Sequence, residues 1–215
     1  MARRCKEDAL ATRQRVLDAA AVVFWKRGVA QASLSEVAQA AGVTRGAVYW
    51  HFANKAALFT ALTECAESIR RDRQERLSNR ARRDPLGALR DGVIEALRAA
   101  ASHEAEARLY ELAFLRTEFN DELECAHRLQ AESESECYRS LEQTLRAAVA
   151  TGQLPGSLDV ELTARAMYSY VTGLMRTAMH PASKLDLANR AETLVDLLLS
   201  GMRQLQPTVR ETSSR

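Results

Sequence analysis

The sequence has 215 residues, of which 47% are hydrophobic and 27% charged, as in a folded globular protein rather than a disordered one. Only nine glycines and four prolines interrupt it, which favours helices and leaves too few turn residues for an all-β fold. The formal net charge is +2, but residues 1–60 carry nine Lys/Arg against four Asp/Glu, whereas the rest carry 21 against 24. A basic N-terminal part points to a partner rich in phosphate, although chance alone can also produce such a difference.

Several classes of protein are excluded by the same features. The longest stretch without a formal charge, residues 147–158, has 12 residues, whereas a membrane-spanning helix needs about 20 apolar ones. No apolar run of the signal-peptide type follows the basic start. The four cysteines, Cys5, Cys65, Cys125 and Cys137, lie far apart and lack metal-ligand spacing. We therefore expect a cytoplasmic protein with reduced thiols, no metal, no cofactor and no membrane partner, and a redox role for a cysteine stays open.

An apolar stripe with helical period predicts a first helix over about residues 6–27. The stripe comprises Val16, Leu17, Ala20, Val23 and Phe24. Gly28 ends this helix, at a position where a left-handed residue is commonly needed. Ser33 and Glu36 form the S-x-x-E pattern of a capping box, which opens a second helix that Gly42 stops.

Thr44 is the expected cap of a third helix over residues 45–52. Val48 and Phe52 lie four residues apart and therefore share its inward face. Two short helices, joined by a tight turn and braced by a longer first helix, form the helix-turn-helix arrangement. In that arrangement the second helix of the pair enters the major groove of DNA.

The rest of the sequence predicts further helices. Asn54 caps a helix that begins at Lys55, and Asp84-Pro85 opens the next helix with a cap and a first-turn proline. After a break near residues 102–103, helices are expected around residues 109–114, 120–151, 159–179 and 185–205. The last two carry apolar residues on more than one side, which predicts contact with the protein's own core and with a partner subunit. We therefore predict an all-α protein with a helix-turn-helix domain at 1–55, a connecting helix at 56–84 and a larger ligand-binding and dimerisation domain at 85–215.

Residues 10–59 resemble the TetR family of one-component repressors. The matching segments are Thr12-Arg13, residues 16–20, Phe24, residues 27–29, Ser33-Leu34, Val37-Ala38, residues 41–52, Asn54-Lys55 and Leu58-Phe59. Shorter segments at 84–87, 150–156 and 170–174 resemble the branch that represses multidrug efflux pumps in Gram-negative bacteria. The resemblance implies an all-helical dimer that leaves its operator when a hydrophobic compound binds.

The residues expected to contact DNA stand at helix starts and on the outward side of the third helix. They are Ser33, Thr44, Arg45, Gly46, Tyr49, Trp50, His51 and Lys55. Ser33 and Thr44 precede helix N-termini, where free amides attract phosphate, although they would cap helices in any protein. Arg45 can read guanine with its fork of donors, Gly46 leaves room for close approach, and Lys55 adds a positive charge. In the family pattern the same positions contact DNA.

The resemblance to the efflux-pump branch implies that two apolar faces line a ligand pocket. The expected lining residues are Tyr110, Phe114, Met167, Tyr168, Val171, Thr172 and Met175. Methionine adapts to ligands of several shapes, but stripes of this kind are also ordinary core. The expected dimer contacts are Leu174, Leu187, Leu194, Leu198 and Met202. The expected partners are double-stranded operator DNA, a second copy of the chain in a homodimer, and a small hydrophobic or aromatic inducer.

Other classes of protein fit the sequence less well. An enzyme is disfavoured because the four histidines lie far apart and no nucleophile elbow, P-loop, dinucleotide fingerprint or zincin motif is present. A helical protein that has lost operator binding is disfavoured because residues 44–46 and 49–55 keep the full family pattern. An activator, or a TetR-type regulator of metabolic rather than efflux genes, stays open.

Overall fold

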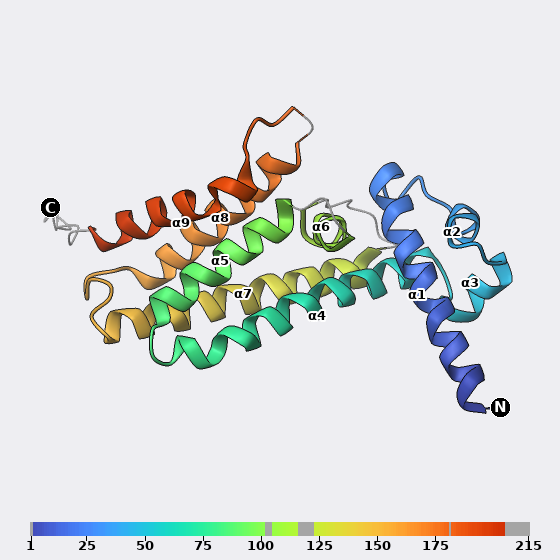
Figure 1. Cartoon of the computed structure of the whole chain (residues 1–215), viewed down its shortest axis with the longest axis horizontal. Helices are drawn as coiled ribbons and strands as arrows, with labels where there is room; N and C mark the ends of the chain where they lie inside the picture. Colours follow the sequence, from blue (N-terminus) through green and yellow to red (C-terminus); the bar gives the residue numbers. More distant parts are fainter. Residues whose placement is uncertain (1, 102–104, 116–122, 181, 205–215) are drawn as a thin grey trace, which may run out of the picture. The chain divides into compact units, whose positions relative to one another are not determined.

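The computed structural model describes residues 2–101, 105–115, 123–180 and 182–204, which form helices and connecting turns (Figure 1). The elements are α1 (Ala2–Arg27), α2 (Leu34–Ala41), α3 (Arg45–His51), α4 (Lys55–Ala81), α5 (Pro85–Ala101), α6 (Ala105–Tyr110), the π-helical turn η1 (Glu111–Leu115), α7 (Glu124–Ala150), α8 (Val160–Met179) and α9 (Leu187–Arg203). No strand occurs within the described ranges, and the predicted all-α fold is confirmed. None of the helices in these ranges combines the length and apolarity needed to cross a membrane. The predicted helix start near residue 120, the break near 102–103 and the helix end at 205 lie outside the described residues.

The chain divides into two compact units. Unit 1 comprises Met1–Asp72 and Ser102–Glu134, and unit 2 comprises Arg73–Ala101 and Ser135–Arg215. The long helices α4 and α7 each contribute residues to both units. This division differs from the sequence-based boundaries at residues 55 and 84, because the core of the N-terminal helices includes residues from much later in the chain.

One hydrophobic core holds the helices of unit 1 together. Val16, Ala20 and Phe24 are fully buried on the predicted face of α1, which packs against α2. The same core continues through Leu112 in η1 and Ala126 in α7. The helix-turn-helix therefore shares its interior with η1 and with α6, which also packs on α1.

Local sequence signals place the turns around α2 and α3. Gly28 and Gly42 adopt left-handed backbone, with φ of 80° and 64°, and end α1 and α2 as predicted. Ser33 and Glu36 form both halves of the predicted capping box at the start of α2. Thr44 caps α3 with its side-chain oxygen. The turn between α2 and α3 is thus fixed at one end by the left-handed backbone of Gly42 and at the other by the cap at Thr44, and the sequence predicts both.

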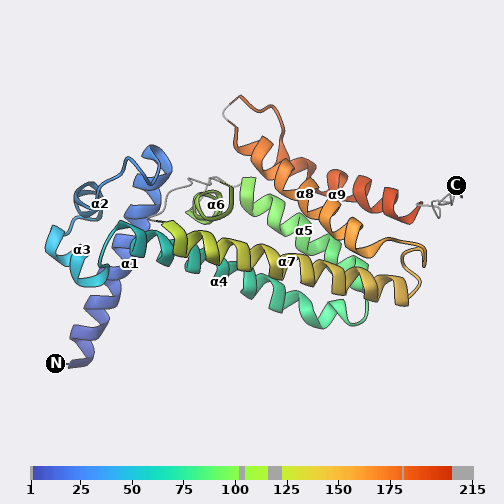
Figure 2. The same ribbon diagram turned by 180° about the vertical axis from the view of Figure 1, so that it is seen from behind.

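In unit 2, α5 packs against both α8 and α9. Figure 2 shows these three helices from behind, relative to the view of Figure 1. Leu86, Ile94 and Leu97 are its large buried side chains. The buried residues of α9 lie at helical spacing and are Leu187, Ala191, Val195, Leu199 and Met202. Burial of both sets removes the apolar faces of these helices from water and stabilises their packing.

Ion pairs join α5 to α9 at the rim of this packing. The guanidinium of Arg90 donates two hydrogen bonds to Asp196, at 2.6 and 2.9 Å, and Arg98 lies 2.6 Å from Glu192. Exposed pairs contribute only about 0.2–1 kcal/mol each, and a bidentate geometry such as that of Arg90 lies at the stronger end. The pairs therefore fix how the helices align, while the apolar core supplies most of the stability.

A hydrogen-bonded clamp joins the start of α5 to the turn after α7. The carboxylate of Asp84 accepts from the amide of Gly87 at 2.9 Å, as expected for the predicted cap, and from the side-chain amide of Gln153 at 2.8 Å. The amide of Leu86 donates to the side-chain oxygen of Gln153 at 3.1 Å. Donation first from Gln153 and then from Gly87 holds the pKa of Asp84 below its ordinary value. The clamp brings together two of the short segments that resemble the efflux-pump branch, residues 84–87 and 150–156.

Replacing Gly87 with alanine is expected to weaken this clamp. A Cβ atom at position 87 would lie 2.6 Å from Cγ of Asp84, so the carboxylate that binds Gln153 would have to move. We expect Gly87→Ala to lower the midpoint of urea denaturation, since a cap and a part-buried hydrogen bond are disturbed together.

Gly156→Ala is the matched control, because a Cβ atom there meets nothing within 4 Å. Equal stability of the Gly87→Ala variant and the wild type would show that the clamp tolerates the displacement.

Candidate nucleic-acid interface

Helix α3 presents a polar and aromatic surface because its apolar residues face inward. Val48 is fully buried and Phe52 is 4% exposed, as predicted from their spacing. Tyr49 and Trp50, by contrast, are 45% and 73% exposed. Large aromatic side chains are seldom left this exposed without a partner, so the outward side of α3 is a candidate binding surface.

Arg45 and Tyr49 form an ordered pair on this surface. The guanidinium of Arg45 donates to the hydroxyl of Tyr49 at 3.2 Å and lies 5.4 Å from the centroid of its ring. A guanidinium has five N–H donors, so most of them remain available to a partner. The contact with Tyr49 therefore orients Arg45 without using up its binding capacity.

Gly46 is not required by the protein's own packing. Its φ is not left-handed, and a Cβ atom would meet only Oγ1 of Thr44, at 3.9 Å. Alanine would also be the better helix former at this position. A glycine here places no side chain on the surface of α3, so a partner can approach the helix backbone closely.

His51 lies beside this surface and is half-buried. Its ring centroid is 4.5 Å from that of Trp50, in an edge-on arrangement. Burial lowers the pKa of His51 below its ordinary value, and the positive charge of Arg13 lowers it further. The ring is therefore neutral near pH 7 and offers one N–H donor.

The remaining predicted contact residues already have partners within unit 1. The hydroxyl of Ser33 donates to Glu36 at 2.9 Å and accepts from its amide at 3.3 Å, and the hydroxyl of Thr44 accepts from the amide of Ala47 at 3.1 Å. The ammonium of Lys55 donates to the carbonyl of Ala30 at 2.7 Å. The sequence predicted only a positive charge for Lys55, but the structure shows that it also ties the start of α4 to the turn before α2. An ammonium has three donors, so this bond does not preclude a second contact.

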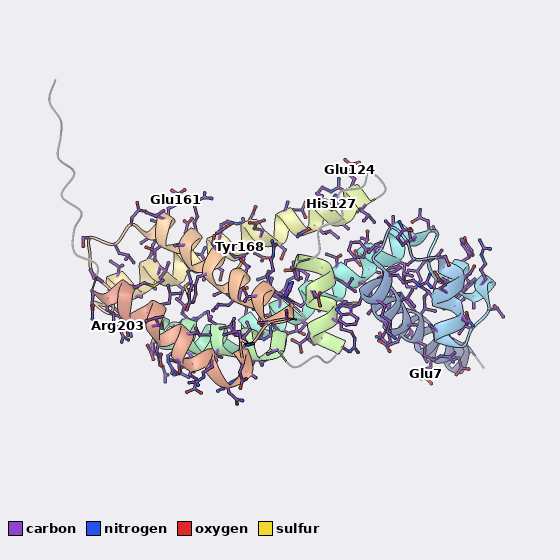
Figure 3. The ribbon with its side chains drawn as sticks, turned by 90° about the horizontal axis from the view of Figure 1, so that it is seen from above. Glu7, Glu124, His127, Glu161, Tyr168 and Arg203 are labelled. Carbon is purple, nitrogen blue, oxygen red and sulfur yellow. The ribbon has the colours of Figure 1, made fainter. Side chains whose placement is uncertain are left out.

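The candidate ligand residues fall into two groups. In unit 1, the rings of Tyr110 and Phe114 lie 4.9 Å apart. In unit 2, Met167 and Met175 are almost fully buried on α8, and Tyr168, labelled in Figure 3, packs at 4.6 Å against Tyr138 of α7 (Figure 3). Tyr138 was missed by sequence reasoning, because nothing in the sequence tells which α7 residue faces α8.

The other two candidate ligand residues on α8 are half-buried. The hydroxyl of Thr172 donates to the carbonyl of Tyr168 at 2.8 Å, one turn earlier in the same helix, and Val171 lies beside it. The hydroxyl of Thr172 is thus already bonded within α8.

Exposed leucines occur on both α8 and α9, outside the packing described above. Leu162 and Leu197 are 64% and 68% exposed. Leu174, Leu194 and Leu198, which were expected at a dimer interface, are half-buried. The exposed leucines of α8 and α9 are therefore candidates for contact with a partner subunit.

Two residues expected at the dimer interface need a correction. Leu187 and Met202 are 1% and 4% exposed and belong to the buried side of α9. The helix is apolar on two sides, and helical spacing alone could not assign these residues to the correct one. Leu162 and Leu197 are exposed leucines that were not among the expected dimer contacts.

Comparison with known proteins identifies the family. Residues 16–62 match the family described as bacterial regulatory proteins, tetR family, and residues 84–204 match the C-terminal region of the MAATS-type transcriptional repressors. The chain therefore belongs to the TetR family of transcriptional regulators. It is a helix-turn-helix DNA-binding repressor by class, and its relatives are transcriptional regulators rather than enzymes.

Individual relatives are similar over almost their whole length. The transcriptional regulator TtgR of Pseudomonas putida is 37% identical over 212 residues, which cover 98% of this chain and 100% of TtgR. NalD, the secondary repressor of the MexAB-OprM multidrug efflux pump in Pseudomonas aeruginosa, is 31% identical with a TM-score of 0.79, covering 93% of this chain and 100% of NalD. SmeT, the repressor of the Stenotrophomonas maltophilia multidrug efflux pump SmeDEF, is 29% identical in its triclosan complex, with a TM-score of 0.79, covering 95% of this chain and 98% of SmeT.

Lowering the pH is expected to strengthen DNA binding through His51. Because its pKa lies below the ordinary value, His51 is neutral in the free protein, whereas a DNA phosphate bound beside it, as the sequence predicts, would favour the protonated ring. Binding then takes up a proton, and affinity rises as the pH falls from about 7.5 to about 6. Fluorescence anisotropy at constant ionic strength should show a larger rise for the wild type than for His51→Gln. Identical pH profiles of the two proteins would contradict this role.

Proposed function

We propose that this chain represses a multidrug efflux operon: it binds operator DNA as a homodimer and is released by a small hydrophobic ligand. The observation that carries the DNA-binding part is the outward side of α3, where Arg45, Tyr49 and Trp50 are exposed around a glycine that the fold does not need. The efflux part is supported by NalD and SmeT, which repress efflux pumps and share the fold of this chain. We therefore expect the protein in the bacterial cytoplasm, where it can reach the chromosome.

In this proposal, Arg45 reads bases and the residues around it bind the DNA backbone. The fork of Arg45 can bond O6 and N7 of guanine in the major groove, and Gly46 allows the helix to approach closely. Tyr49, Trp50 and His51 offer ring donors to phosphates at the groove edge. The hydroxyl groups of Ser33 and Thr44 and the ammonium of Lys55 supply further phosphate contacts.

The candidate ligand residues are proposed to contact the ligand. Tyr110 and Phe114 offer aromatic surfaces, and Met167 and Met175 offer adaptable apolar ones. The structure of SmeT with triclosan supports a hydrophobic aromatic compound as the ligand class. Ligand binding is proposed to move α4 and so change the separation of the two recognition helices of the dimer, which is about 34–36 Å for successive major grooves.

Replacing Arg45 tests the proposed reading of DNA. A bidentate contact to guanine is worth about 1–3 kcal/mol, so Arg45→Ala should weaken binding to the DNA upstream of the protein's own gene by roughly 5- to 160-fold. The measurement is fluorescence anisotropy across a salt series, with scrambled DNA as competitor. Arg146→Ala is the control, because Arg146 is an exposed arginine of unit 2 that pairs with Glu142. An unchanged preference of the Arg45→Ala variant for the upstream DNA would rule out Arg45 as the reader.

The same assay with triclosan tests ligand control. Triclosan should lower the affinity of the wild type for this DNA by a factor in the usual range of about 5–150 for allosteric coupling. Equal affinity at every triclosan concentration, and with other hydrophobic antibiotics, would contradict release by such ligands.

Charging the exposed leucines tests the proposed dimer. Leu197→Glu places a carboxylate on the exposed side of α9, where a partner helix would have to bury it. We expect a shift from dimer to monomer in analytical ultracentrifugation at micromolar concentration. Leu10→Glu is the control, since Leu10 is also an exposed leucine, at 59%, but lies on α1. A Leu197→Glu variant that remains fully dimeric would show that the subunits pair elsewhere.

A further inference from the structure

The helix-turn-helix has a direct structural connection to the segment that carries Tyr110 and Phe114. Helices α1 and α6 and the turn η1 belong to the same compact unit and pack against one another. Leu112 and Ala113 of η1 are 2% and 5% exposed, and Leu112 belongs to the core that holds α1. A change in η1 therefore acts on α1 without passing through any other helix.

A polar contact crosses this packing between α1 and η1. The indole N–H of Trp25 donates to the carboxylate of Glu111 at 2.6 Å, in a partly buried setting. Hydrogen bonds to an ionised carboxylate are stronger than neutral ones, and partial burial strengthens them further. The bond therefore links Glu111 of η1 directly to α1.

The turn that carries Glu111 is itself an unusual local structure. Five residues, Glu111–Leu115, wind as a π-helix at the end of α6. Such turns hold one residue more than a regular α-helical turn and occur frequently at functional sites. The carbonyl of Phe114 accepts a hydrogen bond from the side chain of Gln130 on α7 at 3.3 Å. The π-helical turn is thus held at its start by Trp25 and at its end by Gln130.

We propose that the hydrogen bond between Trp25 and Glu111 is a latch that couples ligand binding to the helix-turn-helix. Tyr110 immediately precedes the π-helical turn and Phe114 lies within it, so a ligand that binds their rings competes with the π-helical winding. Rewinding the turn as a regular α-helix increases the rotation between successive residues, which turns Glu111 relative to Phe114 and takes its carboxylate away from Trp25. Loss of the bond removes the polar link between η1 and α1 and lets α1 shift on the core that both share. This inference rests on the proposed function, because it explains how a ligand would reach the DNA-binding surface.

Removing the donor tests the latch. Trp25→Phe keeps an aromatic ring in the core but lacks the N–H group. The quantity measured is the ratio of DNA affinities without and with saturating triclosan. We expect this ratio to fall from the wild-type value to within about threefold of one, while triclosan still binds the variant in a direct calorimetric titration. An unchanged ratio would overturn the latch.

Variants of the acceptor keep the test independent of any packing defect at Trp25. Glu111→Ala should lose coupling to the same extent as Trp25→Phe, and the double variant should lose no more than either single one, since both remove the same bond. Glu111→Gln keeps an acceptor oxygen and should retain most of the coupling. Glu142→Gln, which changes a partly exposed carboxylate on α7, is the control for loss of one negative charge. Additive losses in the double variant would show that the two residues act separately and would overturn the proposal.

The latch and the proposed function fail in different ways. If triclosan releases the wild type and the Trp25→Phe variant equally, only the latch is overturned. If triclosan and the other antibiotics release neither protein, ligand control itself fails and the latch falls with it. Coupling between two sites acts in both directions, so it can also be measured without ligand. DNA binding should change the rate of hydrogen exchange at residues 111–115 in the wild type but not in the Trp25→Phe variant. The same change in both proteins would also overturn the latch.

Discussion

Helix α3 depends on the burial of two side chains. A helix of seven residues is too short to be stable alone in water, because nucleation costs more than so few hydrogen bonds return. Val48 and Phe52 place α3 on the core of unit 1, and Thr44 caps its start. With the inward side occupied, Arg45 and Tyr49 have no position except the surface. The proposed DNA-binding surface is therefore a consequence of the core beneath it.

The same core explains why the chain does not divide where its sequence composition changes. The basic N-terminal part ends near residue 60, yet the core beneath α3 extends to Leu112 and Ala126. An N-terminal fragment that stopped at the predicted boundary of 55 would expose the surface that these residues cover. The helix-turn-helix and the segment around Tyr110 are thus parts of one folded body, which favours coupling between them.

Local features of the fold could be predicted from the sequence, because short-range chemistry determines them. The glycine at position 42, the capping box at Ser33 and the cap at Thr44 each act within four residues. Contacts between distant segments could not be predicted in the same way. The bond from Lys55 to Ala30, the pairing of Tyr138 with Tyr168 and the bond from Trp25 to Glu111 each depend on how helices pack. The side of α9 that holds Leu187 and Met202 depends on packing as well, since the helix is apolar on two sides.

The two tryptophans lie in opposite environments, so the intrinsic fluorescence of the protein can report on two different sites. Trp50 is 73% exposed on α3, whereas the indole of Trp25 is partly buried and bonded to a carboxylate. Aqueous quenchers such as iodide reach an exposed indole far more readily than a buried one, and emission shifts to the red with exposure. The two contributions to the fluorescence can therefore be separated without an attached dye. One indole reports events at the surface of α3, and the other reports events at the junction of α1 and η1.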